Sequence, residues 1–481
     1  MIVFALVAHA EAAEVGGYLR VMTRPDFEGG DGRLGYWNLY GRLLNEGPYA
    51  ALELRQAVLE PHPGSTDVWS DLHAKIEGGS IQSADGGGGS LVNFRLSQVY
   101  AQAGNIALAN VTWRVGTLES NFGDLGLYDM RPTQILSDTL GMSARYQPGP
   151  IDLTIGAGDA GYSIHGVAYN TVFSGGGALR ARLGKHVELG FGGQAYYEPA
   201  VEGNRNAPYD TPGITTKNWL QGKVVESWLD EHPNQESEFP DPVATDARSY
   251  KAVAYVGVGN AGPIRWNGLY ASWTRRHPLG PTTETVEGAD YTLYVTSLTD
   301  ERDELVVGDE LQMTIVPDRL DISVAGLYGN ATDEDNDLAP TNDDRTYYST
   351  VLRTQIYLVP TVHLLVETSI AKEISHNGNT FRNHYDSLFE NTNGQPDGDG
   401  LEMGDSAERD TWQGKAGIVL NPMGPGIYTR PSLRLMYGLQ YSTQNNAFGN
   451  SFVDTLDQFN SFGNVERHWH NVIALEAEAW F

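Results

Sequence analysis

The last thirteen residues of the chain constrain its fold more than any other stretch. They read W-H-N-V-I-A-L-E-A-E-A-W-F, and Ile473, Leu475 and Phe481 alternate with Glu476 and Glu478. Successive side chains of a strand point to opposite faces, so a strand here has one apolar face and one face with two carboxylates. A transmembrane barrel needs strands of about 9–11 residues with lipid on one side and a polar interior on the other. An edge strand of a soluble sheet is the alternative, and the rest of the chain discriminates between the two.

The same two-faced pattern recurs along the whole chain. From Glu14 onward, segments of about ten residues with period-two alternation are separated by turn-forming residues, and no helical period is sustained. The expected strands include Val15–Met22, Trp37–Leu44, Tyr49–Val58, Ala289–Leu298, Thr346–Leu358, Tyr428–Tyr441 and Trp469–Phe481.

The connections between these segments differ in length. Short ones include Asn45–Pro48 and Gly184–His186, whereas Pro61–Ser90, Glu198–Arg248 and Ile374–Asp410 are long. Short turns at one end and long loops at the other are typical of an outer-membrane barrel. We therefore predict an all-β fold, a transmembrane antiparallel β-barrel of about eighteen strands with long external loops.

Composition agrees with this fold and excludes one class of partner. Asp and Glu number 61 against 32 Lys and Arg, and the net charge of −29 argues against nucleic acid as a partner. The chain has no Cys, which fits an extracytoplasmic compartment. Its longest uncharged apolar run is far shorter than the roughly 20 residues of a spanning helix.

The first residues have the composition of a secretion signal. Met1–Ala8 is apolar, and Ala8-His9-Ala10 has the small-x-small form of a signal-peptidase site. We interpret residues 1–12 as a residual signal peptide and residues 13–481 as a single barrel domain. An apolar first strand is the alternative interpretation of the first segment.

Several segments resemble the maltoporin family of sugar-specific outer-membrane porins. The segments are Gly17-Tyr18-Leu19-Arg20, Tyr49-Ala50-Ala51-Leu52-Glu53-Leu54, Asn93-Phe94-Arg95, Tyr428-Thr429-Arg430-Pro431, Asn445-Asn446-Ala447-Phe448-Gly449 and the final Trp480-Phe481. The resemblance implies a homotrimer of large barrels in the outer membrane of a Gram-negative bacterium. It also implies passive diffusion of maltose and maltodextrins, with oligosaccharide solutes and outer-membrane lipids as partners and no covalent chemistry.

The resemblance also implies a row of pore-lining aromatic residues. Sugar rings have apolar C–H faces that pack on aromatic rings, while their hydroxyls need polar partners. The positions that match the family's aromatic slide are Tyr18, Tyr49, Trp266, Tyr428 and Trp480, and those that match its polar track are Arg20, Arg42 and Arg95. Strand phase places the aromatics, Trp266 apart, on the same faces as charged residues, which in a barrel is the lumen. An interfacial aromatic girdle is the alternative for all but Trp480.

Glu119–Arg131 matches the family's inward-folded constriction loop. Its candidate residues are Glu119, Asp124, Tyr128, Asp129 and Arg131. Arg131 stands where the family has a constricting Tyr. Ala51 replaces the early track glutamate, and Trp69 is the nearest residue to the family's subunit-donated aromatic. These departures concern the preference for maltodextrins and leave the barrel prediction unchanged.

Other chemistry is weakly indicated. We expect no cofactor, although the acidic runs at 333–337 and 397–400 have carboxylates that calcium prefers. A solvated surface loop is the favoured explanation of these runs. The alternative functions are a porin with little sugar preference or another solute, and a barrel enzyme such as an outer-membrane lipid hydrolase.

Overall fold

The computed structural model describes residues 13–25, 32–35, 38–60, 66–78, 94–161, 163, 171–199, 246–278, 282–286, 289–293, 302–333, 345–375, 408–443 and 468–481. Residues 1–12, the expected signal remnant, lie outside this part of the chain, as do residues 334–337 and 397–400 of the acidic runs. Within the described residues, no helix is both long and apolar enough to cross a membrane.

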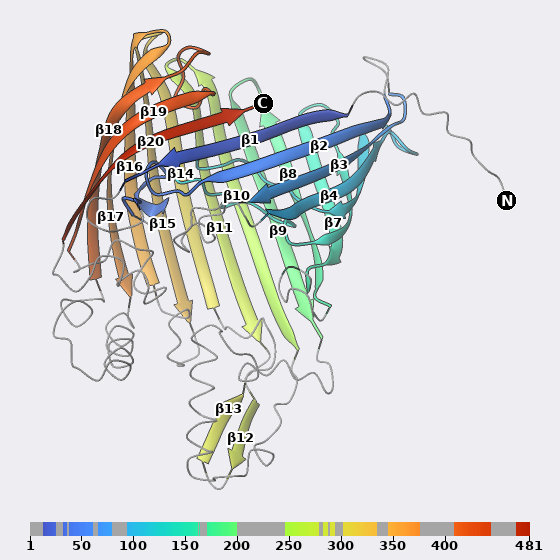
Figure 1. Ribbon diagram of the computed structural model, residues 1–481. Helices are drawn as coiled ribbons and strands as arrows, with labels where there is room; N and C mark the ends of the chain where they lie inside the picture. The colour runs from blue at the N-terminus through green and yellow to red at the C-terminus, as the bar shows by residue number, and fades with distance from the viewer. Residues whose placement is uncertain are drawn as a thin grey trace.

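The described chain consists almost wholly of antiparallel strands (Figure 1). The first half contains β1 (Glu14–Thr23), β2 (Tyr49–Leu59), β3 (Trp69–Gly78), β4 (Phe94–Gly104), β5 (Val111–Thr117), β6 (Leu140–Tyr146), β7 (Ile151–Asp159), β8 (Phe173–Leu183) and β9 (Val187–Glu198), with one 3-10 turn, η1 (Asn38–Tyr40). The second half contains β10 (Ala247–Ala261), β11 (Ile264–Pro278), β14 (Arg302–Val316), β15 (Leu320–Asp333), β16 (Arg345–Val359), β17 (Val362–Ser375), β18 (Glu408–Leu420), β19 (Ser432–Ser442) and β20 (Trp469–Trp480). A separate hairpin, β12 (Thr282–Val286) and β13 (Ala289–Leu293), forms its own two-stranded sheet.

The sheet closes on itself. Each barrel strand pairs with the next, and β1 pairs with β20 so that Tyr18 lies opposite Trp480 and Arg20 opposite Glu478. The terminal residue joins this seam, because the Gly17 amide donates to the Phe481 carbonyl over 2.9 Å and the Phe481 amide donates back over 3.1 Å. The 18-stranded sheet confirms the predicted fold class.

The two faces of the wall differ as a membrane barrel requires. Along β16, Tyr348, Leu352 and Ile356 are exposed, while the alternating Val351 and Arg353 are buried. Exposed aromatics gather near the strand ends that carry the long connections: Phe173, Tyr197, Tyr250, Trp273, Tyr328, Tyr348, Trp412 and Trp469. An apolar outer face with an aromatic girdle is the anatomy of an outer-membrane barrel, and this chain spans the outer membrane.

Some strand predictions were wrong. Residues 38–44 of the expected strand Trp37–Leu44 form no strand. Instead, Leu39, Tyr40, Leu43 and Leu44 are buried inside the barrel within the β1–β2 connection. Asn45–Pro48 belongs to the same connection and is no short turn. The expected loop Pro61–Ser90 contains β3, which divides it into two separate connections.

Two further predictions need correction. The described part of Ala289–Leu298, residues 289–293, forms β13 of the separate hairpin and no strand of the barrel wall. The strand expected at Tyr428–Tyr441 begins at Ser432, so Tyr428 lies in the β18–β19 turn. With these corrections, each connection at one end of the barrel is shorter than the two neighbouring connections at the other end.

Two inward segments, residues 32–48 and residues 118–139, occupy much of the lumen. Leu34, Leu43 and Leu44 of the first pack against the inner wall of β17–β20, and Leu125, Leu127 and Tyr128 of the second pack against β11–β17. The inner wall of β3–β8 is less covered, since Trp69, Gln98, Tyr100, Arg114 and Arg180 remain half-buried. The accessible part of the lumen therefore runs along the first half of the barrel.

Candidate functional site

The inward loop, residues 118–139, is fixed to the wall by specific contacts. The Leu127 amide donates to the Glu310 carboxylate over 2.9 Å, and the Leu136 amide donates to Gln194 Oε1 over 2.7 Å. The Tyr128 hydroxyl donates to the Ala325 carbonyl over 3.3 Å and accepts from Ser349 Oγ over 2.8 Å. Tyr128 is thus an anchor of the loop, fully buried, and its ring does not face the open lumen.

The remaining candidates of this loop lie on its accessible side. Arg131 Nη1 lies 3.2 Å from Glu119 Oε1, and Arg131 Nε lies 3.3 Å from Asp124 Oδ1. Glu119 also accepts from Gln98 Nε2 of the wall over 2.7 Å. Arg131 is therefore a cation held between two carboxylates.

The two inward segments meet around Glu46 and Asp129. The Arg42 amide donates to the Leu127 carbonyl over 2.8 Å, and Arg42 Nε lies 3.2 Å from Glu46 Oε2. Burial raises the pKa of Glu46 to about 7, against the opposing effect of Arg42 and Arg20, and the Asp129 carboxylate raises it further. Burial would also raise the pKa of Asp129, but Arg42, a hydrogen bond with Glu46 and Arg20 lower it overall. Of the two carboxyls, Glu46 is therefore the one that takes up a proton more readily.

Three of the predicted aromatics form a row across β20, β1 and β2. The Trp480 and Tyr18 rings lie 6.3 Å apart, and the Tyr18 and Tyr49 rings lie 5.6 Å apart. Trp480 is 55% exposed and lies on the inward phase of its strand. We call Trp480, Tyr18 and Tyr49 the aromatic row.

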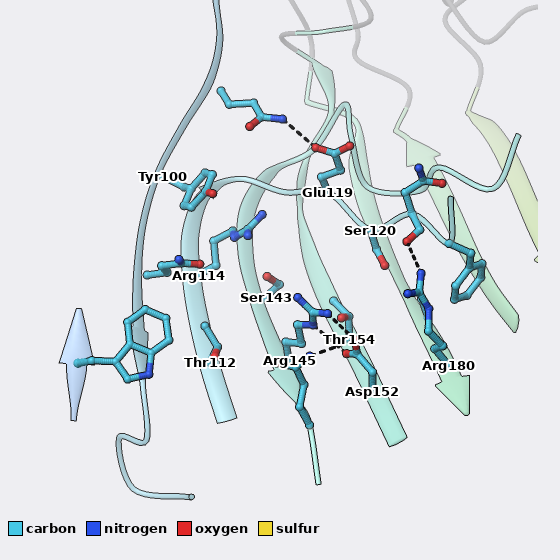
Figure 2. A pocket seen from close by; sticks show the side chains of 17 residues that line it. Tyr100, Thr112, Arg114, Glu119, Ser120, Ser143, Arg145, Asp152, Thr154 and Arg180 are labelled. Carbon is cyan, nitrogen blue, oxygen red and sulfur yellow. Dashed lines mark hydrogen bonds and ion pairs between the residues drawn. The ribbon is translucent and has the colours of Figure 1, made fainter. Parts of the chain in front are cut away.

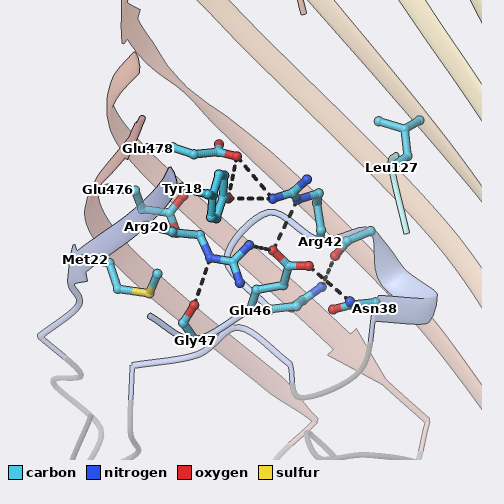
Figure 3. Close-up of polar contacts among 12 residues, drawn as sticks. Tyr18, Arg20, Met22, Asn38, Arg42, Glu46, Gly47, Leu127, Glu476 and Glu478 are labelled. Carbon is cyan, nitrogen blue, oxygen red and sulfur yellow. Dashed lines mark hydrogen bonds and ion pairs between the residues drawn. The ribbon is translucent and has the colours of Figure 1, made fainter. Parts of the chain in front are cut away.

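Glu478 is the charged centre beside this row (Figure 3). The Tyr18 hydroxyl donates to Glu478 Oε1 over 2.6 Å, and Arg42 Nη2 donates to the same oxygen over 3.2 Å. Arg430 Nε lies 2.7 Å from Glu478 Oε2, and the Arg430 guanidinium lies 5.8 Å from the Trp480 ring centre. The carboxylate thus holds aromatic and cationic side chains along one stretch of lumen wall.

Trp266 and Tyr428 form a second aromatic group. Their rings lie 6.5 Å apart, and within the described residues no ring contact joins them to the aromatic row. The Tyr428 hydroxyl donates to Glu310, and Trp266 Nε1 donates to Gln312 Oε1 over 2.7 Å. Burial raises the pKa of Tyr428, which lies beneath the inward loop next to Gly126. The five predicted slide positions are therefore divided between the aromatic row and a separate pair.

The predicted polar-track arginines differ in access. Arg20 and Arg42 are largely buried, and Arg20 forms an ion pair with Glu46. The Arg95 side chain is 76% exposed and Nη2 lies 3.1 Å from Glu77 Oε1. Glu77 also accepts from the Tyr49 hydroxyl over 2.7 Å.

Sequence reasoning missed Glu77. It lies on β3, directly opposite Ala51. The alternation of Leu72 and Ile76 with His73 and Glu77 could have revealed β3, but the strand was hidden inside a Gly-rich stretch assigned to a loop.

A cavity of about 400 Å³ lies between the β3–β8 wall and the inward loop (Figure 2). Trp69, the residue nearest to the expected subunit-donated aromatic, lines this cavity inside its own barrel. Tyr100, Arg114, Glu119 and Arg180 line it as well. Sequence reasoning singled out Trp69 and Glu119 but not the arginines. Among the described residues, no group of three or more His, Asp or Glu could hold a metal ion.

Comparisons with known proteins yield structural likeness only. No protein-family model matches the chain. No curated protein matches it. Among solved structures, OccK3 (OpdO) of Pseudomonas aeruginosa is similar at 10% sequence identity, over 99% of this chain and 97% of that one, with a TM-score of 0.41. OprD of the same organism is similar at 10% identity, over 98% and 97% of the two chains, with a TM-score of 0.40. The trimer form of OmpT, an outer membrane protein of Vibrio cholerae, is similar at 10% identity, over 98% and 100%, with a TM-score of 0.37.

The assignment of this chain rests on its own geometry. Its strands close into one antiparallel barrel, its outer face is apolar and aromatic, and charged groups line its interior. These features together show that the chain is an outer-membrane β-barrel.

Proposed function

We propose that the protein is a channel for passive, facilitated diffusion of sugars of the maltose and maltodextrin type. The observation that carries this proposal is the aromatic row, whose rings follow one another at 6.3 and 5.6 Å beside Glu478 and the arginines around it. Each ring offers an apolar face to a sugar ring, while the charged groups replace water at its hydroxyls. Such a row provides successive shallow sites without covalent chemistry.

Block of ionic current by sugar tests this proposal. We expect maltohexaose at millimolar concentration to interrupt the current through single channels of the wild-type protein in a planar bilayer. Replacing Tyr49 and Trp480 together by Ala should weaken this block at least about tenfold, since each aromatic contact contributes of order 1 kcal/mol. Trp273→Ala, which removes an outward-facing aromatic instead, is the matched control, and maltohexaose should block its current as it blocks that of wild type.

Two results would contradict the sugar proposal. One is an open wild-type channel whose current maltohexaose leaves unchanged, which would indicate a channel for other solutes. The other is equal block in wild type and in the double variant, which would remove the aromatic row from the sugar path. Absence of any conductance would contradict the channel itself.

We also propose that three barrels associate through the wall around β5 and β6. These strands have only seven residues each, so a tilt of about 45° gives them a height of about 17 Å, less than the apolar band of about 25 Å. Strand β16, with 15 residues, crosses that band easily. A low wall is better covered by a neighbouring subunit than by lipid, and this supports the homotrimer that the family resemblance implies.

A further inference from the structure

We propose that the cavity between the β3–β8 wall and the inward loop is a second solute-binding site, which takes an acidic sugar through its carboxylate and one ring face. This ligand class differs from the neutral sugars proposed for the aromatic row. The inference uses the proposed function only for the route by which the solute arrives, because binding at this cavity requires no transport.

The site lies on the short-turn side of the inward loop. Trp69, Thr112 and Asp152 sit at or next to the first residues of their strands, which follow short turns, and Gln102 sits near the corresponding end of β4. Residues 119–122 of the inward loop cover the other side. The cavity volume of about 400 Å³ lies within the range of small-molecule sites, about 300–1,000 Å³.

The charge of the lining is opposite in sign to that of the chain. Arg114, Arg145 and Arg180 face Glu119 and Asp152, so three positive minus two negative charges leave +1, whereas the whole chain carries −29. Solutes with a carboxylate are therefore favoured locally, on a chain whose net charge repels them.

Arg114 is the group that lacks an anionic partner. The other charged lining residues are engaged, since Arg145 Nε lies 2.8 Å from Asp152 Oδ1, Glu119 pairs with Arg131, and Arg180 donates to the Asn121 carbonyl. Arg114 forms no hydrogen bond or ion pair with another described residue, and its one specific contact is the face of Tyr100.

A three-layer stack holds Arg114 in place. The His73 and Tyr100 rings lie 4.6 Å apart at 15°, and the Arg114 guanidinium lies 4.0 Å from the Tyr100 ring centre, so the layers follow β3, β4 and β5. Stacking leaves the in-plane N–H groups of a guanidinium available, and their fork matches a carboxylate. Gly116 lies opposite Tyr100 at φ +124, and a Cβ there would come within 2.7 Å of the Tyr100 Cα, so glycine is needed for this packing.

The rest of the lining suits a sugar ring. The Trp69 ring lies over Gly104, where a Cβ would clash with its Nε1, and it provides an aromatic face at the cavity edge. The side chains of Gln98, Gln102, Thr112 and Ser143 can hydrogen bond to hydroxyls. These groups would accept a neutral sugar as well, but only an acidic sugar also neutralises Arg114.

Calorimetric titration of the full-length barrel in detergent tests the inference, with trigalacturonate and maltotriose as probes. We expect trigalacturonate to bind at least about tenfold more tightly than maltotriose at low salt, and this preference to fall as salt is raised. Arg114→Gln should bind the two probes with similar affinity, and Trp69→Ala should bind both probes more weakly than wild type does. Arg182→Gln is the matched control, because Arg182 is a 62% exposed side chain of the same wall that pairs with Glu188 outside this cavity.

Equal binding of the two probes to wild type would overturn the inference, and so would trigalacturonate binding to Arg114→Gln with wild-type affinity. The heat-dependent gel shift of a folded barrel checks each variant. If Arg114→Gln does not fold, Arg114→Lys is tested in its place. A preference of Arg114→Lys for trigalacturonate that weakens as salt is raised supports the site. A preference that does not change with salt overturns it. If the wild-type protein is blocked by maltohexaose but does not bind trigalacturonate, this inference alone is overturned. If the wild-type protein binds trigalacturonate but is not blocked by maltohexaose, the proposed function alone is overturned.

Discussion

Glu46 is a residue through which we expect pH to act on the inside of this barrel. It lies between Arg20 and Arg42 and faces Asp129, where the two inward segments meet. Its pKa of about 7 is above that of an ordinary carboxyl, about 4.3. The folded protein therefore holds a proton there that the unfolded chain would release, and the contact is stabilised at low pH.

We predict that this stabilisation is complete below about pH 4.3 and is lost as the pH rises through about 7. Above that pH, two ionised carboxyls face each other between the segments, and the loop contact should loosen. Open-channel current noise should accordingly be higher at pH 8 than at pH 5. The current noise of Glu46→Gln should be low at both pH values. Glu53 is a half-exposed lumen carboxylate, and Glu53→Gln should show the same pH dependence as wild type. Identical pH dependence in wild type and Glu46→Gln would contradict the prediction.

Residue positions could be predicted from the sequence wherever strand phase alone decided them. The inward placement of Tyr18, Tyr49 and Trp480 follows from alternation, and Phe481, on the opposite phase, is indeed exposed. Glu77 could not be found by aligning one strand with a family pattern, because its carboxylate reaches Tyr49 from the neighbouring strand. To recognise that a side chain on a neighbouring strand takes the place of an expected one, the pairing register of the two strands must be known. Only the structure provides this register.

At the scale of elements, the inward segments are the parts that sequence reasoning placed least well. Residues 38–44 contain the apolar Leu39, Tyr40, Leu43 and Leu44, which an outward-facing strand would also contain. Alternation cannot tell whether such residues face lipid or the inner wall. The loop at Glu119–Arg131 was found because the family resemblance, and not its periodicity, indicated it. Its buried anchors, Leu125 and Leu127, carry no local signal.

Glu310 links the inward loop to the wall, because it accepts both the Leu127 amide and the Tyr428 hydroxyl. We predict that Glu310→Gln weakens this attachment, since a charge-assisted acceptor is replaced by a neutral one. The loop should then move more, and the single-channel conductance should rise and fluctuate. Asp321→Asn is the matched control, because Asp321 is a buried carboxyl on the next strand that bonds Tyr357 and not the loop. An unchanged conductance in Glu310→Gln would show that apolar packing alone holds the loop.

For the whole molecule, closure into a barrel was predictable because every strand repeats one pattern. Period-two alternation and the contrast between short and long connections both indicate the same architecture, so errors at single segments did not alter it. The uneven height of the wall was not predictable, because β5 and β6 are as well patterned as longer strands and differ only in where pairing stops. The lower wall has consequences for assembly.

Single-cysteine variants can determine what covers that lower wall, and the natural chain has no Cys to interfere. Val115 on β5 and Leu435 on β19 both point outward and are 57% and 55% exposed in one barrel. We predict that a fluorophore at Val115→Cys is shielded from brominated lipid in the native assembly, whereas one at Leu435→Cys is quenched. Dissociation to monomers should expose the Val115→Cys label to quenching, because only a neighbouring subunit shields it. Equal quenching at the two positions in the native assembly would show that lipid covers both walls and would contradict association through β5 and β6.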